Sequence, residues 1–137
     1  MLTVTKECRF DAAHLITNHK GQCKNLHGHT YRVLVKVAQA DDREDMVIDF
    51  KDLKHVLEEW ILARFDHSFI YNTESPAEAE IAAVVAKHGM KSMGIPFRST
   101  AENLAKYFFQ TLSPHVRVIS VQVYETPDNC AEYTEGC

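Results

Sequence analysis

The stretch "HGHTYRVLVKVAQA", residues 27–40, decides the fold because polar and apolar side chains alternate along it with a period of two. Residues two apart on a strand point to the same side of a sheet. One side is polar and includes Thr30, Arg32 and Lys36. The pattern predicts a half-buried strand. Its inner face consists of His27, His29, Tyr31, Val33, Val35 and Val37.

A second strand is predicted directly before this one. Between Leu2 and His14 every other residue belongs to a more apolar series, and His14 closes that series. The segment "NHKGQCKN", residues 18–25, supplies turn and loop residues, so the two strands can pair with each other. Pairing would bring His14 to the same side of the sheet as His27 and His29.

Helices are predicted in the middle of the chain. Asp49 is a suitable N-cap for a helix with apolar spacing that ends near Phe65. Two segments have the form of a capping box, Ser75–Glu78 and Ser99–Glu102, and each predicts the start of a further helix. Residues 66–73, "DHSFIYNT", are expected to form the loop between the first two helices.

The C-terminal part returns to a strand pattern. The segment "VRVISVQVYE", residues 116–125, is predicted to be a strand, and the tail from 129 to 135 pairs with it as a hairpin around "TPDN". The predicted order of elements is strand, strand, helix, small helix, helix, strand, strand. With no repeat or linker in 137 residues, we expect one domain that spans residues 1–137.

Composition excludes several classes of protein. The formal net charge is −4 and no basic run is present, so a nucleic-acid partner is not expected. The sequence "MLTVTKECRF" does not read as a secretion signal, and no window has the apolar length of a membrane span. We therefore expect a soluble, cytoplasmic protein without a membrane partner, whose four cysteines are reduced thiols.

Three histidines suggest a metal centre. His27 and His29 share one strand face, and His14 is the natural third ligand because it ends the neighbouring strand; Asp11 falls on the opposite face. Three imidazoles with one open position are typical of catalytic zinc. Two other interpretations remain open: core histidines that bind no metal, and a closed structural zinc site that includes Cys23.

Five segments, "FDAAH", "CKNLHGH", "FDHSFI", "STAENLA" and "VYET", resemble the 6-pyruvoyltetrahydropterin synthase and 6-carboxytetrahydropterin synthase family in order and rough spacing. The resemblance covers essentially the whole chain. A cysteine shortly ahead of His-Gly-His is similar to the 6-carboxytetrahydropterin synthase branch of the queuosine pathway. The resemblance implies an α+β tunnelling fold, an antiparallel sheet with helices on one face whose barrel is completed by oligomerisation. The usual assembly is a homohexamer of two stacked trimers with active sites at subunit interfaces.

The resemblance also implies roles for individual residues. The zinc (Zn²⁺) ligands would be His14, His27 and His29. The catalytic residues would be Cys23 as general base and Asp66 with His67 as a proton-relay pair. The pterin would be anchored by Glu125, with Thr100 and Glu102 as weaker pocket candidates. Two departures from the family pattern are Ala101, where many members have a hydroxyl residue, and a longer segment from about residue 73 to 97.

The residue types suit these roles, although each has a simpler interpretation. A thiolate is favoured near a cation, which suits Cys23 as a base; the alternative is a loop thiol. An aspartate can fix the tautomer of a partner histidine, but "DH" after a helix is also a common C-terminal charge interaction. Glu125 can accept two N–H groups of a pterin, or it is simply an exposed strand end.

The implied reaction converts 7,8-dihydroneopterin triphosphate to 6-carboxy-5,6,7,8-tetrahydropterin with loss of acetaldehyde and triphosphate, which makes the chain a zinc-dependent carbon–carbon lyase. A second hypothesis is that the chain is a 6-pyruvoyltetrahydropterin synthase, which eliminates triphosphate without carbon–carbon cleavage. A third is a non-catalytic module that binds zinc and a pterin. Retention of Cys23, Asp66 and His67 together favours an enzyme, because a binding module needs no base.

Overall fold

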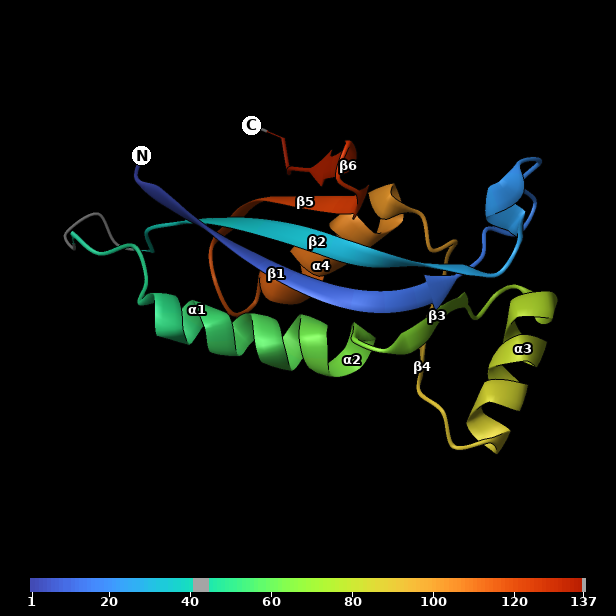
Figure 1. Ribbon diagram of the computed structural model, residues 1–137. Helices are drawn as coiled ribbons and strands as arrows, with labels where there is room; N and C mark the ends of the chain where they lie inside the picture. Colours follow the sequence, from blue (N-terminus) through green and yellow to red (C-terminus); the bar gives the residue numbers. More distant parts are fainter. Residues whose placement is uncertain (41–44, 137) are drawn as a thin grey trace.

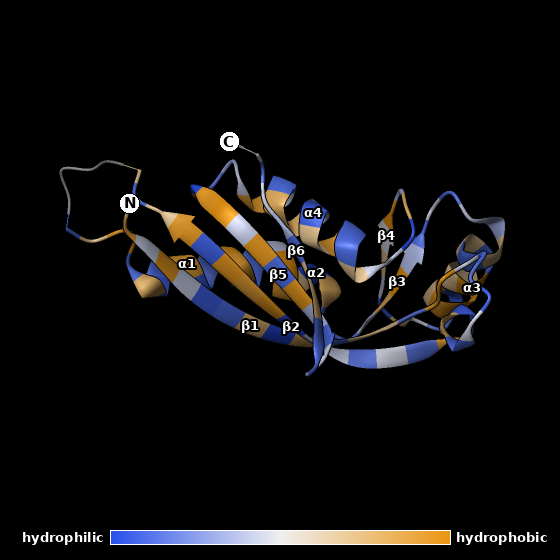
Figure 2. Cartoon of the chain, turned by 90° about the horizontal axis from the view of Figure 1, so that it is seen from above, coloured by the Kyte–Doolittle hydropathy of each residue, from blue (hydrophilic) through white to orange (hydrophobic). Residues whose placement is uncertain are grey.

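The computed structural model describes residues 1–40 and 45–136. These residues form one six-stranded sheet in the order β4-β3-β1-β2-β5-β6, which curves around its helices as a half-barrel (Figure 1). Alternating hydrophilic and hydrophobic residues mark the long strands (Figure 2). The strands are β1 (Thr3–His14), β2 (His27–Ala38), β3 (Ser68–Asn72), β4 (Ser92–Ile95), β5 (Val118–Thr126) and β6 (Asn129–Tyr133).

The α+β fold is confirmed, but the sheet is mixed where an antiparallel sheet was expected. The β1–β2, β2–β5 and β5–β6 pairs are antiparallel, whereas β3 runs parallel to β1 and β4 parallel to β3. The prediction of a loop over residues 66–73 is wrong for Ser68–Asn72. This short strand is covered on both faces, so it lacks the period-two alternation that reveals a half-buried strand.

The predicted helices are present. The first is continuous and consists of α1 (Phe50–Leu57), a π-helical turn η2 (Glu58–Leu62) and α2 (Ala63–Phe65). The others are α3 (Pro76–Lys87) and α4 (Ala101–Leu112), and a short 3₁₀ helix η1 (Gln22–Lys24) lies in the β1–β2 connection. None of the helices in the described ranges is long and apolar enough to cross a bilayer.

Helices cover both faces of the sheet at one end, which corrects the expectation of helices on one face. The main core lies between the sheet and the α1–α2 and α4 helices, and it includes Ile70 of β3. Phe69, the preceding residue, packs with Ala82 of α3 and Leu15 in a second cluster. Because neighbouring residues of a strand point to opposite faces, α3 lies on the other side of β3.

The start of α4 differs by one residue from the prediction. The N-cap is Thr100, whose side-chain oxygen accepts a hydrogen bond from the Asn103 amide, so the capping box predicted for Ser99–Glu102 does not form. The predicted box pairs Ser99 with Glu102 three positions later, whereas the residue three positions after Thr100 is Asn103. The side chain of Ser99 is buried elsewhere, against His14.

A buried carboxylate ties α3 to the rest of the fold. Glu78 is fully buried and accepts hydrogen bonds from the Thr17 hydroxyl at 2.8 Å and the Asn72 amide at 3.0 Å. We expect Glu78→Ala to lower the free energy of unfolding by about 2–3 kcal/mol, because it leaves buried donors unpaired. Denaturant unfolding at fixed protein concentration, with exposed Glu80→Ala as the control, measures this effect. Equal midpoints for the two variants would contradict it.

The described cysteines agree with the expectation of reduced thiols. Cys8, Cys23 and Cys130 are free, and Cys137 lies outside the described residues. Cys8 is partly buried against the main core, and burial raises its pKa to about 12. Its thiol therefore stays neutral and acts as a small core side chain.

Candidate metal and pterin site

The register of β1 and β2 brings the three predicted histidines together. His14 pairs directly with His27, and His29 follows on the same face of β2. The ring centroids lie 4.6 Å apart for His14 and His27, 5.1 Å for His14 and His29, and 4.8 Å for His27 and His29. One nitrogen of each ring lies within 4.8 Å of the other two. The three side chains thus converge on a common point.

Hydrogen bonds to backbone carbonyls orient two of these rings. Nδ1 of His14 lies 2.9 Å from the carbonyl oxygen of Ser99 and 3.1 Å from its hydroxyl. Nδ1 of His27 lies 2.7 Å from the carbonyl oxygen of Asn25. Because a carbonyl only accepts, both Nδ1 atoms carry the proton and donate it. The Nε2 atoms are then left with free lone pairs, the arrangement that metal-binding histidines use.

The histidine cluster fits a zinc ion. Nε2 of His14 is buried without a hydrogen-bond partner among the described residues, which is costly unless a ligand satisfies it. Nε2 of His27 lies 3.1 Å from Nε2 of His29. Two ligands of a tetrahedral ion with Zn–N distances of about 2.0–2.1 Å lie roughly 3.3 Å apart. The spacing suits one ion that both nitrogens share.

Burial keeps the His14 and His29 rings neutral. It lowers the pKa of His14 to about 4, and it also lowers the pKa of His29, with the neighbouring His27 adding to the effect. A neutral imidazole is the form that binds a metal ion. At neutral pH the site therefore needs no proton release from either ring.

Glu125 borders the histidine cluster. Its carboxylate oxygens lie 4.0 Å from Nε2 of His14 and 3.8 Å from Nε2 of His29. Burial raises the pKa of Glu125, and the negative charge of Glu102 raises it further. Both glutamates line a cavity of about 380 Å³ beside the cluster. Glu102 is not part of a capping box, so its carboxylate is available to a ligand.

Asp66 and His67 form a second group with Asp11 on the outer face of β1. The Asp11 amide donates to Oδ1 of Asp66 at 3.1 Å, and the Asp11 carbonyl accepts from the His67 amide at 2.7 Å. Oδ1 of Asp66 lies 3.8 Å from Nε2 of His67. His67 has a φ of +58°, and this turn after α2 lets the adjacent Asp66 and His67 side chains meet.

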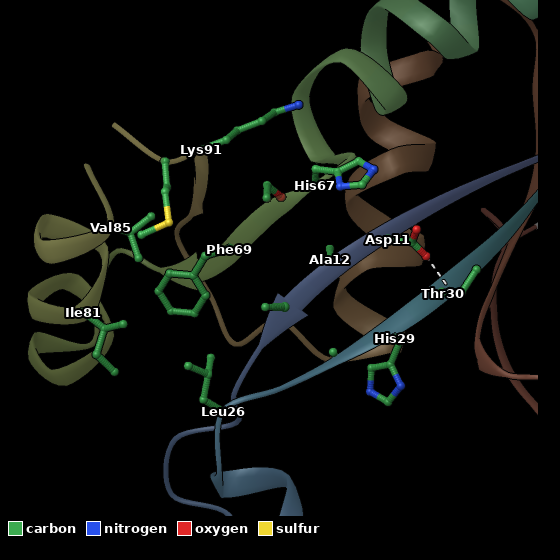
Figure 3. A pocket seen from close by; sticks show the side chains of 14 residues that line it. Asp11, Ala12, Leu26, His29, Thr30, His67, Phe69, Ile81, Val85 and Lys91 are labelled. Atoms are coloured by element: carbon green, nitrogen blue, oxygen red, sulfur yellow. Dashed lines mark hydrogen bonds between the residues drawn. The ribbon is translucent and has the colours of Figure 1, made fainter. Parts of the chain in front are cut away.

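An open cavity of about 730 Å³ touches both groups. It is lined by His29 on one side and by Asp11 and His67 on another (Figure 3). Its remaining wall is mostly apolar, with residues from α3 and the loops, and also includes Thr30, Ser68 and Lys91. Leu26 and Met90 are each 58% exposed. The cavity lies between the histidine cluster and the Asp66–His67 pair.

Cys23 belongs to neither group. It lies on η1 in the β1–β2 connection, and its side chain is exposed. The Cys23 carbonyl accepts a hydrogen bond from the Ile16 amide at 2.8 Å. Ile16 follows His14 by two positions, so this bond holds the Cys23 backbone close to the end of β1. Within the described residues, one chain therefore assembles the three histidines with Glu125, while Cys23 stands at the surface nearby.

Two features of the site were missed by the sequence interpretation. Ser99 is the hydrogen-bond partner of His14 from 85 positions away, and no local pattern signals such a contact. Thr100 was considered only as a pocket residue, although it caps α4. The adjacent hydroxyl residues at 99 and 100 were the available signal, since only one of them can serve as the N-cap.

Comparison with known proteins gives a consistent result. The family model described as 6-pyruvoyl tetrahydropterin synthase matches residues 3–136. The chain is 40% identical to the 6-carboxy-5,6,7,8-tetrahydropterin synthase of Haemophilus influenzae, covering 98% of this chain and 100% of that protein. The protein of the same name from Aquifex aeolicus is 34% identical, over 96% of this chain and 97% of its own length.

Solved structures agree on the fold. An uncharacterised protein from Wolinella succinogenes matches with a TM-score of 0.83 at 20% identity, over 98% of both chains. The 6-pyruvoyl tetrahydropterin synthase of Caenorhabditis elegans matches with a TM-score of 0.69 at 26% identity, over 98% of this chain and 96% of that one. The half-barrel and its helices define a protein of the tunnelling-fold class.

Within that class, the chain belongs to the 6-pyruvoyl tetrahydropterin synthase family. The family resemblance of the five sequence segments is thereby confirmed. The prediction of the 6-carboxytetrahydropterin synthase branch agrees with the names of the relatives from Haemophilus influenzae and Aquifex aeolicus.

Proposed function

We propose that this chain is a zinc-dependent 6-carboxytetrahydropterin synthase of the queuosine pathway. It converts 7,8-dihydroneopterin triphosphate and water to 6-carboxy-5,6,7,8-tetrahydropterin, acetaldehyde and triphosphate. The observation that carries this proposal is the convergence of His14, His27 and His29 with the carboxylate of Glu125 beside them. The names of the relatives support the carbon–carbon lyase reaction rather than simple elimination.

The three histidines would hold the metal ion and leave one position open for substrate. Bound zinc supplies Lewis acidity, which lowers the pKa of hydroxyl groups on the substrate side chain and makes the adjacent C–H bonds more acidic. The donor set consists of imidazoles only, the ligand type that zinc shares with several transition metals. Zinc is our assignment because the family resemblance implies it.

The chain's own residues then have distinct tasks. The Glu125 carboxylate accepts the amino group and the neighbouring ring N–H of the pterin, which fixes the ring beside the histidines. Cys23, as thiolate, removes a proton from the side-chain carbon next to a hydroxyl. Asp66 holds one nitrogen of His67, so the other nitrogen can pass a proton to or from the substrate. Thr100 and Glu102 stay weaker candidates for the pterin pocket.

An oligomer would complete this site. Leu26 and Met90 leave apolar surface exposed at the cavity between the two residue groups, and the nearby Val84 on α3 is 52% exposed. Exposed apolar clusters of this kind are typical of protein interfaces. We propose a homohexamer of two trimers in which a neighbouring subunit covers this cavity. Cys23 and the Asp66–His67 pair would thereby be enclosed with a histidine cluster.

Identification of the product by mass tests the proposal. Zinc-loaded protein incubated with 7,8-dihydroneopterin triphosphate should form 6-carboxy-5,6,7,8-tetrahydropterin. A 6-pyruvoyl product would assign the chain to the 6-pyruvoyltetrahydropterin synthase branch of the family. Tight binding of zinc and pterin without any product would reject both enzyme functions for this substrate and favour a binding module.

A further inference from the structure

Two arginines face each other across the outer side of the sheet. Arg9 of β1 pairs in register with Arg32 of β2, so both guanidinium groups lie on the same face. Like charges directly opposite each other destabilise a sheet. Glu7 lies between them and contacts Nε of Arg9 at 3.2 Å and Nε of Arg32 at 3.1 Å. Two positive charges against one negative charge leave this cluster with a net charge of +1.

The two arginine side chains are held in place, but in the described part of the chain their terminal amino groups keep free hydrogen-bond donors. The Arg32 guanidinium lies 4.1 Å from the centre of the Tyr124 ring, which fixes its plane. Among the described residues, Glu7 is the ion-pair partner of both arginines and contacts each one through Nε. The terminal amino groups of both side chains therefore remain available. The side chains of Arg32 and Glu7 are 33% and 38% exposed, and ion pairs this open to solvent contribute little to stability. The pairing of two arginines is therefore not explained by folding.

The arginine pair opens onto the histidine site. The ladder between β2 and β5 ends at the pair Arg32–Tyr124, although β2 continues back to His27. A cavity of about 480 Å³ lies at this end of the β2–β5 ladder. This cavity is lined by Arg9 and Arg32 as well as by His29 and Glu125. A ligand held at the histidines can thus extend to the arginines.

We propose that Arg9 and Arg32 form the subsite for the triphosphate group of the substrate. This inference rests on the proposed function, in which Glu125 holds the pterin and the histidines face its side chain. The triphosphate is attached to the far end of that side chain. It must therefore extend away from the histidines, and the cavity lined by Arg9 and Arg32 offers space for it. Guanidinium groups bind phosphate oxygens in a bidentate manner, and two of them match an extended polyphosphate.

Binding of inorganic tripolyphosphate tests the subsite. The variants are Arg9→Gln, Arg32→Gln and the double variant, with Arg64→Gln as a matched control. Arg64 also lies over an aromatic ring, 4.4 Å from the centre of Trp60, but lines none of the cavities described above. Each single variant should raise the Kd for tripolyphosphate about tenfold or more, as expected for a lost charge-assisted contact. Arg64→Gln should leave it unchanged.

Kinetics separate the subsite from a general defect. The double variant should raise KM for the triphosphate substrate with little change in kcat, in zinc content or in the inhibition constant of unphosphorylated 7,8-dihydroneopterin. Tripolyphosphate binding is measured with zinc-loaded protein and again after zinc removal, because phosphate oxygens also bind zinc. Wild-type tripolyphosphate affinity in the double variant would overturn the inference. Arginine-dependent binding without turnover by the native chain would support the subsite and reject the proposed function.

Discussion

Replacing His29 by alanine is expected to abolish both zinc binding and turnover. Its Nε2 lies 3.1 Å from that of His27, and the ring is partly buried near the start of β2, so its loss removes a proposed ligand without emptying the core. Loss of a group that merely orients a ligand already costs about 10–100-fold in metal affinity. Loss of the ligand itself should exceed that range. Metal content after dialysis against graded chelator measures the effect independently of activity.

His115→Ala is the matched control for this prediction. His115 stacks on Trp60, with ring centroids 4.3 Å apart, and lies outside both clusters of potential metal ligands in the described residues. It should retain zinc with native affinity. If His29→Ala also kept one zinc per chain at native affinity, the three histidines would not be the metal site.

Replacing Cys23 by alanine is expected to remove turnover while leaving binding intact. Cys23 is exposed and is not one of the clustered potential metal ligands, so neither the fold nor the proposed zinc site depends on its thiol. A positioned general base contributes about 10²–10⁴-fold to a rate, and kcat should fall by that factor. Single-turnover kinetics measure the loss of rate, while pterin binding and zinc content show whether Cys23 acts as a base or as a metal ligand.

Cys130→Ala controls for the loss of an exposed thiol. Cys130 is also exposed, on β6, and it should give native kcat. Equal rates for Cys23→Ala and the native chain would exclude Cys23 as the base. A parallel loss of zinc in Cys23→Ala would instead favour the closed Cys-plus-His site considered from the sequence.

The sequence predicts much of the candidate metal site because strand periodicity is a local property. The two-residue spacing of His27 and His29 and the place of His14 at the end of the preceding strand define the cluster, once the strands pair. Asp11 lies on the opposite face, as the same periodicity requires. The family resemblance adds Cys23, Asp66 and Glu125, whose roles do not follow from spacing.

Features that depend on distant contacts are beyond such patterns. The contact between His14 and Ser99 joins residues 85 positions apart. The sequence pattern instead predicted Ser99 as part of a helix capping box. The strand β3 is buried on both faces and so shows no alternation. Arg9 and Arg32 share a face in the sequence pattern, but their direct opposition requires the exact pairing of β1 with β2.

The ratio of acetaldehyde to triphosphate released by the native, zinc-loaded chain tests the central claim most directly. Both products are quantified in the same reaction with 7,8-dihydroneopterin triphosphate. Carbon–carbon cleavage predicts one acetaldehyde for each triphosphate, together with 6-carboxy-5,6,7,8-tetrahydropterin. Release of triphosphate without acetaldehyde would contradict the lyase function and assign the chain to the elimination chemistry of the 6-pyruvoyl branch.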